Sequence, residues 1–197
     1  QLKEAAVNLA KAYITIAASL ERGGIVFLAG NGGSMSDALH ISGEMLKSYA
    51  RPRPLVEHER AQLLKLPEGA LLADNLERGL RAVVLGTNLA LSSAVENDFR
   101  EHNLAAAQEL NALGRCGDVF VGISTSGKAR NVRLAAQTAK AKGMSTVLLT
   151  GPKDSPLSKE VDISIQAPGE RTDRIQENHI LLYHCLCEML ERDFFDA

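Results

Sequence analysis

His40 and Glu44 stand four positions apart, shortly after the glycine-rich segment Gly30-Asn31-Gly32-Gly33-Ser34. Residues four apart share one face of a helix, so an imidazole and a carboxylate can act on the same ligand. The glycines let the backbone turn sharply and approach that ligand closely. A helix that begins at about Ser36 would add free N–H groups, which favour an anion. This pattern predicts a site for a phosphorylated metabolite, with a metal ion or an acid–base pair beside it.

Two further candidate ligands stand near the end of the chain. Gln176 and His184 lie about two helical turns apart in a largely apolar region. If their helix packs near the glycine segment, both side chains can converge with the His/Glu pair on one zinc-like ion. Two other interpretations stay open, namely a surface pair at His40 and Glu44 and a core histidine at position 184. His179 lies on a different face and is assigned no role.

Ser124, Thr125 and Ser126 form a second polar segment, which follows an apolar stretch and precedes Gly127. Three consecutive hydroxyl residues before a glycine favour a sugar phosphate at the N-terminus of the next helix. The alternative is an ST-turn that caps this helix. The spacing also matches most of a nucleotide-binding P-loop. However, Ala129 stands where that motif needs Ser or Thr for Mg²⁺, which argues against a nucleotide.

Apolar runs and helical periodicities alternate along the chain, which predicts an α/β fold. Strands are predicted at 25–29, 82–85, 118–123, 146–150 and 163–165, and helices at 2–22, about 36–49, 57–79 (one or two), 99–113, 129–142 and 172–195. Asn88 is a candidate helix cap. We expect one domain with a parallel sheet and helices on both faces. Ligands of such sheets bind at the carboxyl ends of strands, where both polar segments lie.

The composition excludes several classes of function. The 197 residues suffice for one domain with its own core, and 22 Lys+Arg against 24 Asp+Glu give a formal charge of −2. This balance argues against nucleic acid and anionic membranes as partners, and 4% aromatic residues argue against a base-stacking surface. No apolar run reaches membrane-spanning length, and three sparse cysteines fit a reducing cytosol. We therefore expect a cytoplasmic protein.

Taken together, the motifs resemble those of the phosphoheptose isomerase family, which has the sugar isomerase (SIS) fold. The matching segments follow the family's order over most of the chain: 30–34, His40-x-x-x-Glu44, Asn97-Asp98-Phe99, 122–127 and Asp173-Arg174-Ile175-Gln176-Glu177 with His184. The resemblance implies a three-layer α/β fold with a central five-stranded parallel sheet. It also implies a single SIS domain over residues 1–197, in which 55–79 is a helical insertion.

The resemblance further implies an isomerase that interconverts sedoheptulose 7-phosphate and D-glycero-D-manno-heptose 7-phosphate through an enediol, for lipopolysaccharide or capsule. It implies a cytoplasmic homotetramer that binds zinc. The implied zinc ligands are His40, Glu44, Gln176 and His184, of which Glu44 and His184 are also the catalytic base and acid. The implied substrate-binding residues are Asn31, Gly32, Gly33, Ser34, Glu44, Asn97, Asp98, Ser124, Thr125, Ser126, Asp173 and Gln176.

The second polar segment departs from the family pattern, because Gly127 is followed by Lys128-Ala129 where the family usually has Asn-Ser. One phosphate-binding hydroxyl is therefore missing, and we hypothesise that Lys128 replaces it. The alternative function is a non-catalytic SIS protein that binds sugar phosphates or associates with the replication initiator. The initiator-binding protein resembles this chain near Cys185-Leu186-Cys187 but lacks the full ligand set. All four candidate ligands are present here, which favours an enzyme.

Overall fold

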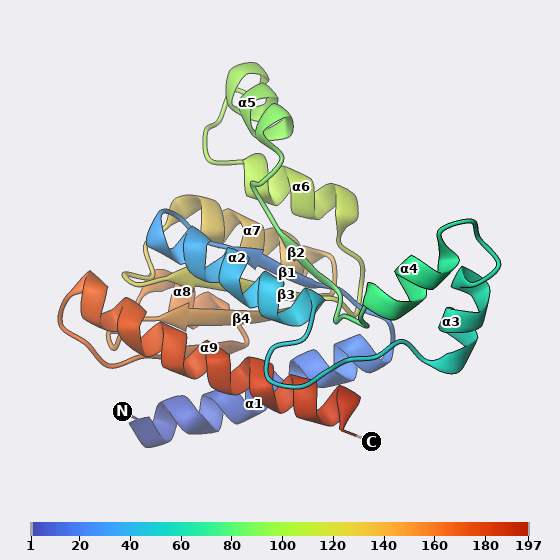
Figure 1. Ribbon diagram of the computed structural model, residues 1–197. Coiled ribbons are helices and arrows are strands. Elements are labelled where there is room, and N and C mark those ends of the chain that lie inside the picture. The colour runs from blue at the N-terminus through green and yellow to red at the C-terminus, as the bar shows by residue number, and fades with distance from the viewer. Residues whose placement is uncertain (1, 197) are drawn as a thin grey trace.

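Five parallel strands form the centre of the protein, as shown by the computed structural model, which describes residues 2–196 (Figure 1). The strands are β1 (Val26–Ala29), β2 (Ala82–Val84), β3 (Val119–Ser124), β4 (Ser145–Thr150) and β5 (Ile163–Gln166). They lie in the order β2-β1-β3-β4-β5, which confirms the predicted sheet. In this order the winding reverses between β1 and β3, so the topological switch point lies there.

Helices cover both faces of the sheet, as predicted. One layer holds α1 (Leu2–Glu21), α2 (Gly33–Leu46) and α9 (Thr172–Phe195), and the other holds α6 (Ala105–Leu113), α7 (Arg130–Ala141) and the short α8 (Pro156–Glu160). Val26 and Leu28 pack in the first core, whereas the intervening Phe27 packs in the second. Burial on both faces explains why the strands are continuous apolar runs in the sequence.

Three helices lie outside these layers (Figure 1). Helices α3 (Glu57–Leu63) and α4 (Gly69–Asn75) extend beyond the sheet, and α5 (Leu89–Asp98) projects past α6. The first two fall within the segment predicted as one or two surface helices, and an Arg60–Asp74 ion pair joins them. Asn88 caps α5 as predicted, since its side chain accepts a hydrogen bond from the Leu91 amide. Within residues 2–196, no helix has the length and apolar character needed to cross a membrane.

Several helix boundaries differ from the prediction. The helix after the glycine segment begins at Gly33 rather than Ser36, because Gly32 completes the turn alone with a φ of +54°, which glycine adopts readily. It also ends at Leu46 rather than near Tyr49. The predicted helix 99–113 starts only at Ala105, and Asn103 before it has a φ of +68° that a helix cannot contain. Helix α8 was missed, since five residues are too few to show a periodicity.

Candidate active site and metal centre

The two polar segments lie next to each other at the carboxyl edge of the sheet. The glycine segment follows β1 and the hydroxyl segment ends β3, and these strands are neighbours. Two hydrogen bonds of 2.8 Å between the side chains of Asn31 and Asn131 join the first segment to the start of α7. Both segments therefore stand at the switch point, where parallel sheets of this type bind ligands.

The glycine segment is also held against α9. A Cβ atom on Gly33 would lie 2.3 Å from Nε2 of Gln176, so the amide end of the Gln176 side chain lies directly against the backbone of this helix start. The contact places Gln176 beside the first turn of α2, and it brings together two residues that were predicted to share a site. Ser34 is buried there, and its amide donates a hydrogen bond of 3.0 Å to the Asn31 carbonyl.

Helices α2 and α9 pack against each other (Figure 1). Three of the four candidate metal ligands meet between them. His40 Nε2 lies 3.1 Å from Glu44 Oε1 and 3.5 Å from His184 Nε2. One ligand atom from each residue lies within 4.8 Å of the others. Ligands at about 2.0–2.2 Å around a tetrahedral zinc ion are about 3.4 Å apart, so the observed spacing fits one ion. His184 is partly exposed at this cluster and is not a core histidine.

Two tyrosines that the sequence analysis did not single out flank this cluster. The Tyr49 ring lies 5.5 Å from the His184 ring, and the Tyr183 ring lies 5.4 Å from the His40 ring. Burial, assisted by the negative charge of Glu44, raises the pKa of Tyr49, so its hydroxyl is protonated at neutral pH. Nothing in the pattern distinguishes these residues from packing residues, because aromatic side chains are common in cores.

Asp37 and His179 lie behind the cluster, in the interior. The Nε2 atom of His179 is 3.2 Å from the Thr150 carbonyl, to which it donates a hydrogen bond. Burial lowers the pKa of His179 to about 4, so the imidazole is neutral at pH 7. Its Nδ1 atom faces Oδ2 of Asp37 at 4.0 Å. Burial raises the pKa of Asp37, and the neighbouring His40 and Tyr183 partly oppose this rise.

The second polar segment opens onto a cavity of about 310 Å³. Thr125 and Ser126 line it together with two lysines, Lys128 and Lys153, and two acidic residues, Asp154 and Glu170. Ser124, the last residue of β3, is buried, and its carbonyl accepts a hydrogen bond from the hydroxyl of Thr150. Hydroxyl and ammonium groups just before the N-terminus of α7 suit a phosphate group.

Three residues predicted to bind substrate lie apart from these features. Asn97 and Asp98 end α5 on the surface, where their side chains form a hydrogen bond of 2.8 Å with each other. The preceding residue, Glu96, lines a cavity of about 210 Å³ together with Asn31. Asp173 is exposed in the first turn of α9 and pairs with the neighbouring Arg171. Their role in substrate binding stays a prediction.

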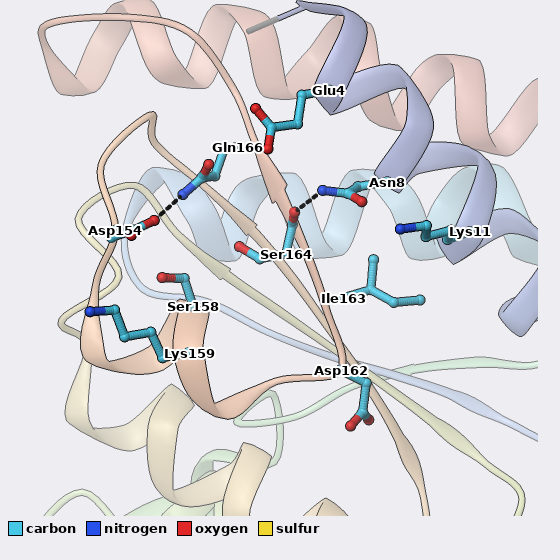
Figure 2. Close-up of a pocket in the computed structure, with 10 residues that line it drawn as sticks. All are labelled: Glu4, Asn8, Lys11, Asp154, Ser158, Lys159, Asp162, Ile163, Ser164 and Gln166. Carbon is cyan, nitrogen blue, oxygen red and sulfur yellow. Dashed lines mark hydrogen bonds between the residues drawn. The ribbon is translucent and has the colours of Figure 1, made fainter.

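A separate cavity of about 260 Å³ lies between α1, α8 and β5 (Figure 2). Figure 2 shows the Asn8 amide donating a hydrogen bond to the Ser164 carbonyl at its wall. Glu4, Asp154 and Asp162 line this cavity together with Lys11 and Lys159, so carboxylates outnumber lysines there. The cavity beside the hydroxyl segment has as many lysines as carboxylates and adds two hydroxyl side chains. The cavity beside the hydroxyl segment is therefore the better candidate for the phosphate of a ligand.

Comparison with known proteins shows which family this chain resembles. The SIS domain family matches residues 99–186. A phosphoheptose isomerase from Thermodesulfovibrio yellowstonii is 38% identical over 181 residues, which cover 92% of this chain and 78% of that protein. The structure of phosphoheptose isomerase GmhA from Neisseria gonorrhoeae matches with a TM-score of 0.74 at 31% identity. The match covers 93% of this chain and 85% of the GmhA chain. A phosphoheptose isomerase from Francisella tularensis has a TM-score of 0.76 at 28% identity, with 94% and 85% covered. Because these similarities extend over most of this chain and of its relatives, the protein belongs to the phosphoheptose isomerase family.

Proposed function

We propose that this protein interconverts sedoheptulose 7-phosphate and D-glycero-D-manno-heptose 7-phosphate, and so supplies heptose for lipopolysaccharide or capsule. Membership of the phosphoheptose isomerase family supports the substrate and the reaction type. The observation that carries the proposal is the cluster of His40, Glu44 and His184, which lies between the two helices α2 and α9 that also hold the glycine segment and Gln176 together. Such a cluster offers both a metal site and acid–base groups to a ligand bound there.

Zinc is the proposed metal, held by His40, Glu44 and His184 with Gln176 as the fourth ligand. Imidazole nitrogens and a carboxylate are preferred zinc ligands, and the distances of 3.1 Å and 3.5 Å among them support this assignment. When bound, zinc would polarise the substrate carbonyl and stabilise the negative charge of the enediolate.

The residues of the chain would move the protons. Glu44 is the proposed base, which takes the proton from one of the two carbons C1 and C2 and returns it to the other. His184 is the proposed acid, which transfers a proton at the oxygens of the same two carbons. The hydroxyl groups of Ser124, Thr125 and Ser126 would hold the phosphate far from the reacting carbons. The binding energy of the phosphate would thereby fix the position of those carbons.

The proposed assembly is a cytoplasmic homotetramer, as the family resemblance implies. Large apolar side chains on α1 and α9 support an interface, since Val7, Ile14 and Leu181 are 56%, 63% and 68% exposed. Contact with further subunits would remove these side chains from water. Light scattering at micromolar concentration should show a tetramer, and a monomer would contradict the assembly.

Turnover of sedoheptulose 7-phosphate within a panel of C5 to C7 ketose phosphates tests the proposed reaction. Proton–deuterium exchange at C1 and C2 should occur with the heptulose phosphate, and sedoheptulose without phosphate is the control for the binding site. Failure of every sugar phosphate to exchange would reject the enzyme. It would favour the alternative, a non-catalytic sugar-phosphate-binding or replication-initiator-associating SIS protein.

Elemental analysis tests the metal site separately. Wild-type protein purified with excess zinc should retain zinc, and His40→Ala should lose it. The matched control is His58→Ala, because His58 is an exposed histidine of α3, outside the cluster. Equal zinc contents in all three proteins would reject the ligand assignment.

A further inference from the structure

The two histidines of the cluster are held by different kinds of contact. Nδ1 of His40 lies 2.9 Å from the hydroxyl oxygen of Tyr183, so a hydrogen bond fixes the direction of this ring. Within residues 2–196, the ring of His184 has one contact of hydrogen-bond length, 3.5 Å between its Nε2 atom and Nε2 of His40, and none at Nδ1. A metal-binding histidine is usually oriented by a hydrogen bond at its second nitrogen. The His184 ring must therefore be oriented by packing.

Three aromatic rings contact the His184 ring. Those of His40 and Tyr183 stand nearly perpendicular to it, at 84° and 87°, with ring centroids 5.0 Å away. The Tyr49 ring is inclined to it by only 33°, with a centroid distance of 5.5 Å. Aromatic rings attract each other in both arrangements at such distances. Tyr183 is the chain neighbour of His184, and His40 is itself a proposed ligand, so Tyr49 is the one of the three rings that joins the cluster from a separate segment.

A buried charge fixes the backbone at Tyr49. The Tyr49 amide donates a hydrogen bond of 2.8 Å to the carboxylate of Glu191, which is 0% exposed, and the next two amides donate to the same carboxylate. The buried Arg53 guanidinium completes the arrangement, since its Nε atom donates to Glu191 at 2.8 Å. Glu191 lies about two turns after His184 on α9. One helix therefore carries both the imidazole and the anchor of the ring that packs against it.

We propose that Tyr49 is a positioning residue for the metal site, which holds the His184 ring in its ligand orientation by packing against it. The inference rests on the proposed function, since His184 is a proposed metal ligand and the proposed acid. A side chain that is already held in its bound orientation loses less rotamer freedom when a ligand binds, so binding is tighter. The contact is made by the aromatic ring of Tyr49, and a phenylalanine at this position should therefore serve equally well.

The zinc affinities of Tyr49→Leu and Tyr49→Phe test this role. Leucine removes the ring and keeps an apolar side chain, whereas phenylalanine removes only the hydroxyl. Competition with a chelator should show a zinc affinity about 2–12-fold below that of wild type for Tyr49→Leu, the effect expected from the loss of one aromatic pair. The affinity of Tyr49→Phe should equal that of wild type. Wild-type affinity in Tyr49→Leu, or an equal loss in both variants, would overturn the proposal.

Tyr13→Leu is the matched control that separates positioning from packing. Both tyrosines are partly buried against the same core, but Tyr13 lies on α1, beside Arg192 and Asp193. Urea unfolding of the metal-free proteins should show similar losses of stability in the two leucine variants, while zinc affinity falls only in Tyr49→Leu. An equal fall of zinc affinity in Tyr13→Leu would trace the effect to packing of the core and overturn the proposal.

Proton NMR of the metal-free protein gives a readout that depends neither on zinc nor on activity. Nuclear Overhauser contacts should join the ring protons of Tyr49 and His184 in wild type, and the ring current of Tyr49 should shift the His184 resonances. Tyr49→Phe should keep this shift and Tyr49→Leu should lose it. If wild type neither binds zinc nor isomerises a sugar phosphate, the proposed function fails, and this measurement alone decides the positioning role. Absence of contacts between the two rings in wild type would overturn it.

Discussion

Helix α9 holds polar groups in two opposite environments, one near its C-terminus and one near its middle. Near its C-terminus Glu191 is 0% exposed, and its carboxylate accepts hydrogen bonds from the Arg53 guanidinium and from the amides of residues 49–51. Two turns earlier, His184 is partly exposed beside Glu44, with ligand atoms turned to a shared space. A buried carboxylate with all its hydrogen-bond partners in place stabilises the fold, whereas partly exposed side chains remain available to bind a ligand.

The buried carboxylate of Glu191 supports the open site around His184. Burial alone would raise the pKa of Glu191, but the amides of Tyr49 and Ala50 and the Arg53 guanidinium hold it below its usual value. Arg53 also donates hydrogen bonds of 2.7 Å to the carbonyls of Met45 and Glu44. These contacts hold the segment after α2, which places the Tyr49 ring against His184.

Glu44→Gln should give the largest effect and should change chemistry without changing stability. The amide keeps the size of the side chain but cannot act as a base, so turnover of sedoheptulose 7-phosphate should fall about 10²–10⁴-fold. Urea unfolding of the metal-free protein should stay close to wild type, because Glu44 is partly exposed. The control is Glu188→Gln, an exposed glutamate of α9 that should keep full turnover. Near-normal exchange at C1 and C2 in Glu44→Gln would show that Glu44 is not the base.

Glu191→Gln should give the opposite result, with a loss of stability. Without the negative charge the buried Arg53 guanidinium has no counter-charge, which typically costs about 3–5 kcal/mol of unfolding free energy. Urea unfolding measures this cost. Glu177→Gln breaks an exposed pair with Arg174 on the same helix and should change stability little. Similar midpoints for Glu191→Gln and Glu177→Gln would contradict the structural role assigned to the buried Glu191.

His179 should make stability depend on pH on the acidic side. Its pKa is about 4 in the folded protein against 6.5 in the unfolded chain, so between these values the unfolded chain binds more protons. The stability present above pH 6.5 is therefore lost as the pH falls towards 4, by about 3 kcal/mol. The raised pKa of Asp37 acts in the opposite direction. Urea unfolding from pH 7 to pH 4 should show a shallower fall for His179→Gln than for wild type, and parallel curves would contradict this assignment.

Lys128→Ala should have the smallest effect and should concern binding alone. Lys128 is an exposed point charge at the cavity beside the hydroxyl segment, and such charges contribute about 0.2–1 kcal/mol. The KM for the sugar phosphate should rise about 1.5–5-fold at low salt, with little change in kcat, and the difference should shrink as salt is added. Lys159→Ala, at the separate cavity of Figure 2, is the matched control. An unchanged KM at low salt would remove Lys128 from the site.

The sequence alone determined the features that depend on neighbours along the chain. Continuous apolar runs between helical periodicities predicted all five strands and the two-layer covering of the sheet, because each element's pattern is set by its own buried faces. The glycine and hydroxyl segments were found in the same way, since turns and helix starts need particular residues. The four-residue spacing of His40 and Glu44 also placed both on one helix face.

Only the tertiary structure decided which faces meet. His184 joins His40 across 144 positions of sequence, and periodicity shows which face of a helix is buried without showing against which partner. The same holds for Tyr183, which looks like an ordinary helix residue until α2 and α9 pack together and its hydroxyl meets the His40 ring. Asn97 and Asp98 end α5, which projects beyond the body of the chain and holds them on the surface, and their role in substrate binding stays a prediction. The site depends on long-range packing, which brings residues together only after the chain has buried its apolar faces.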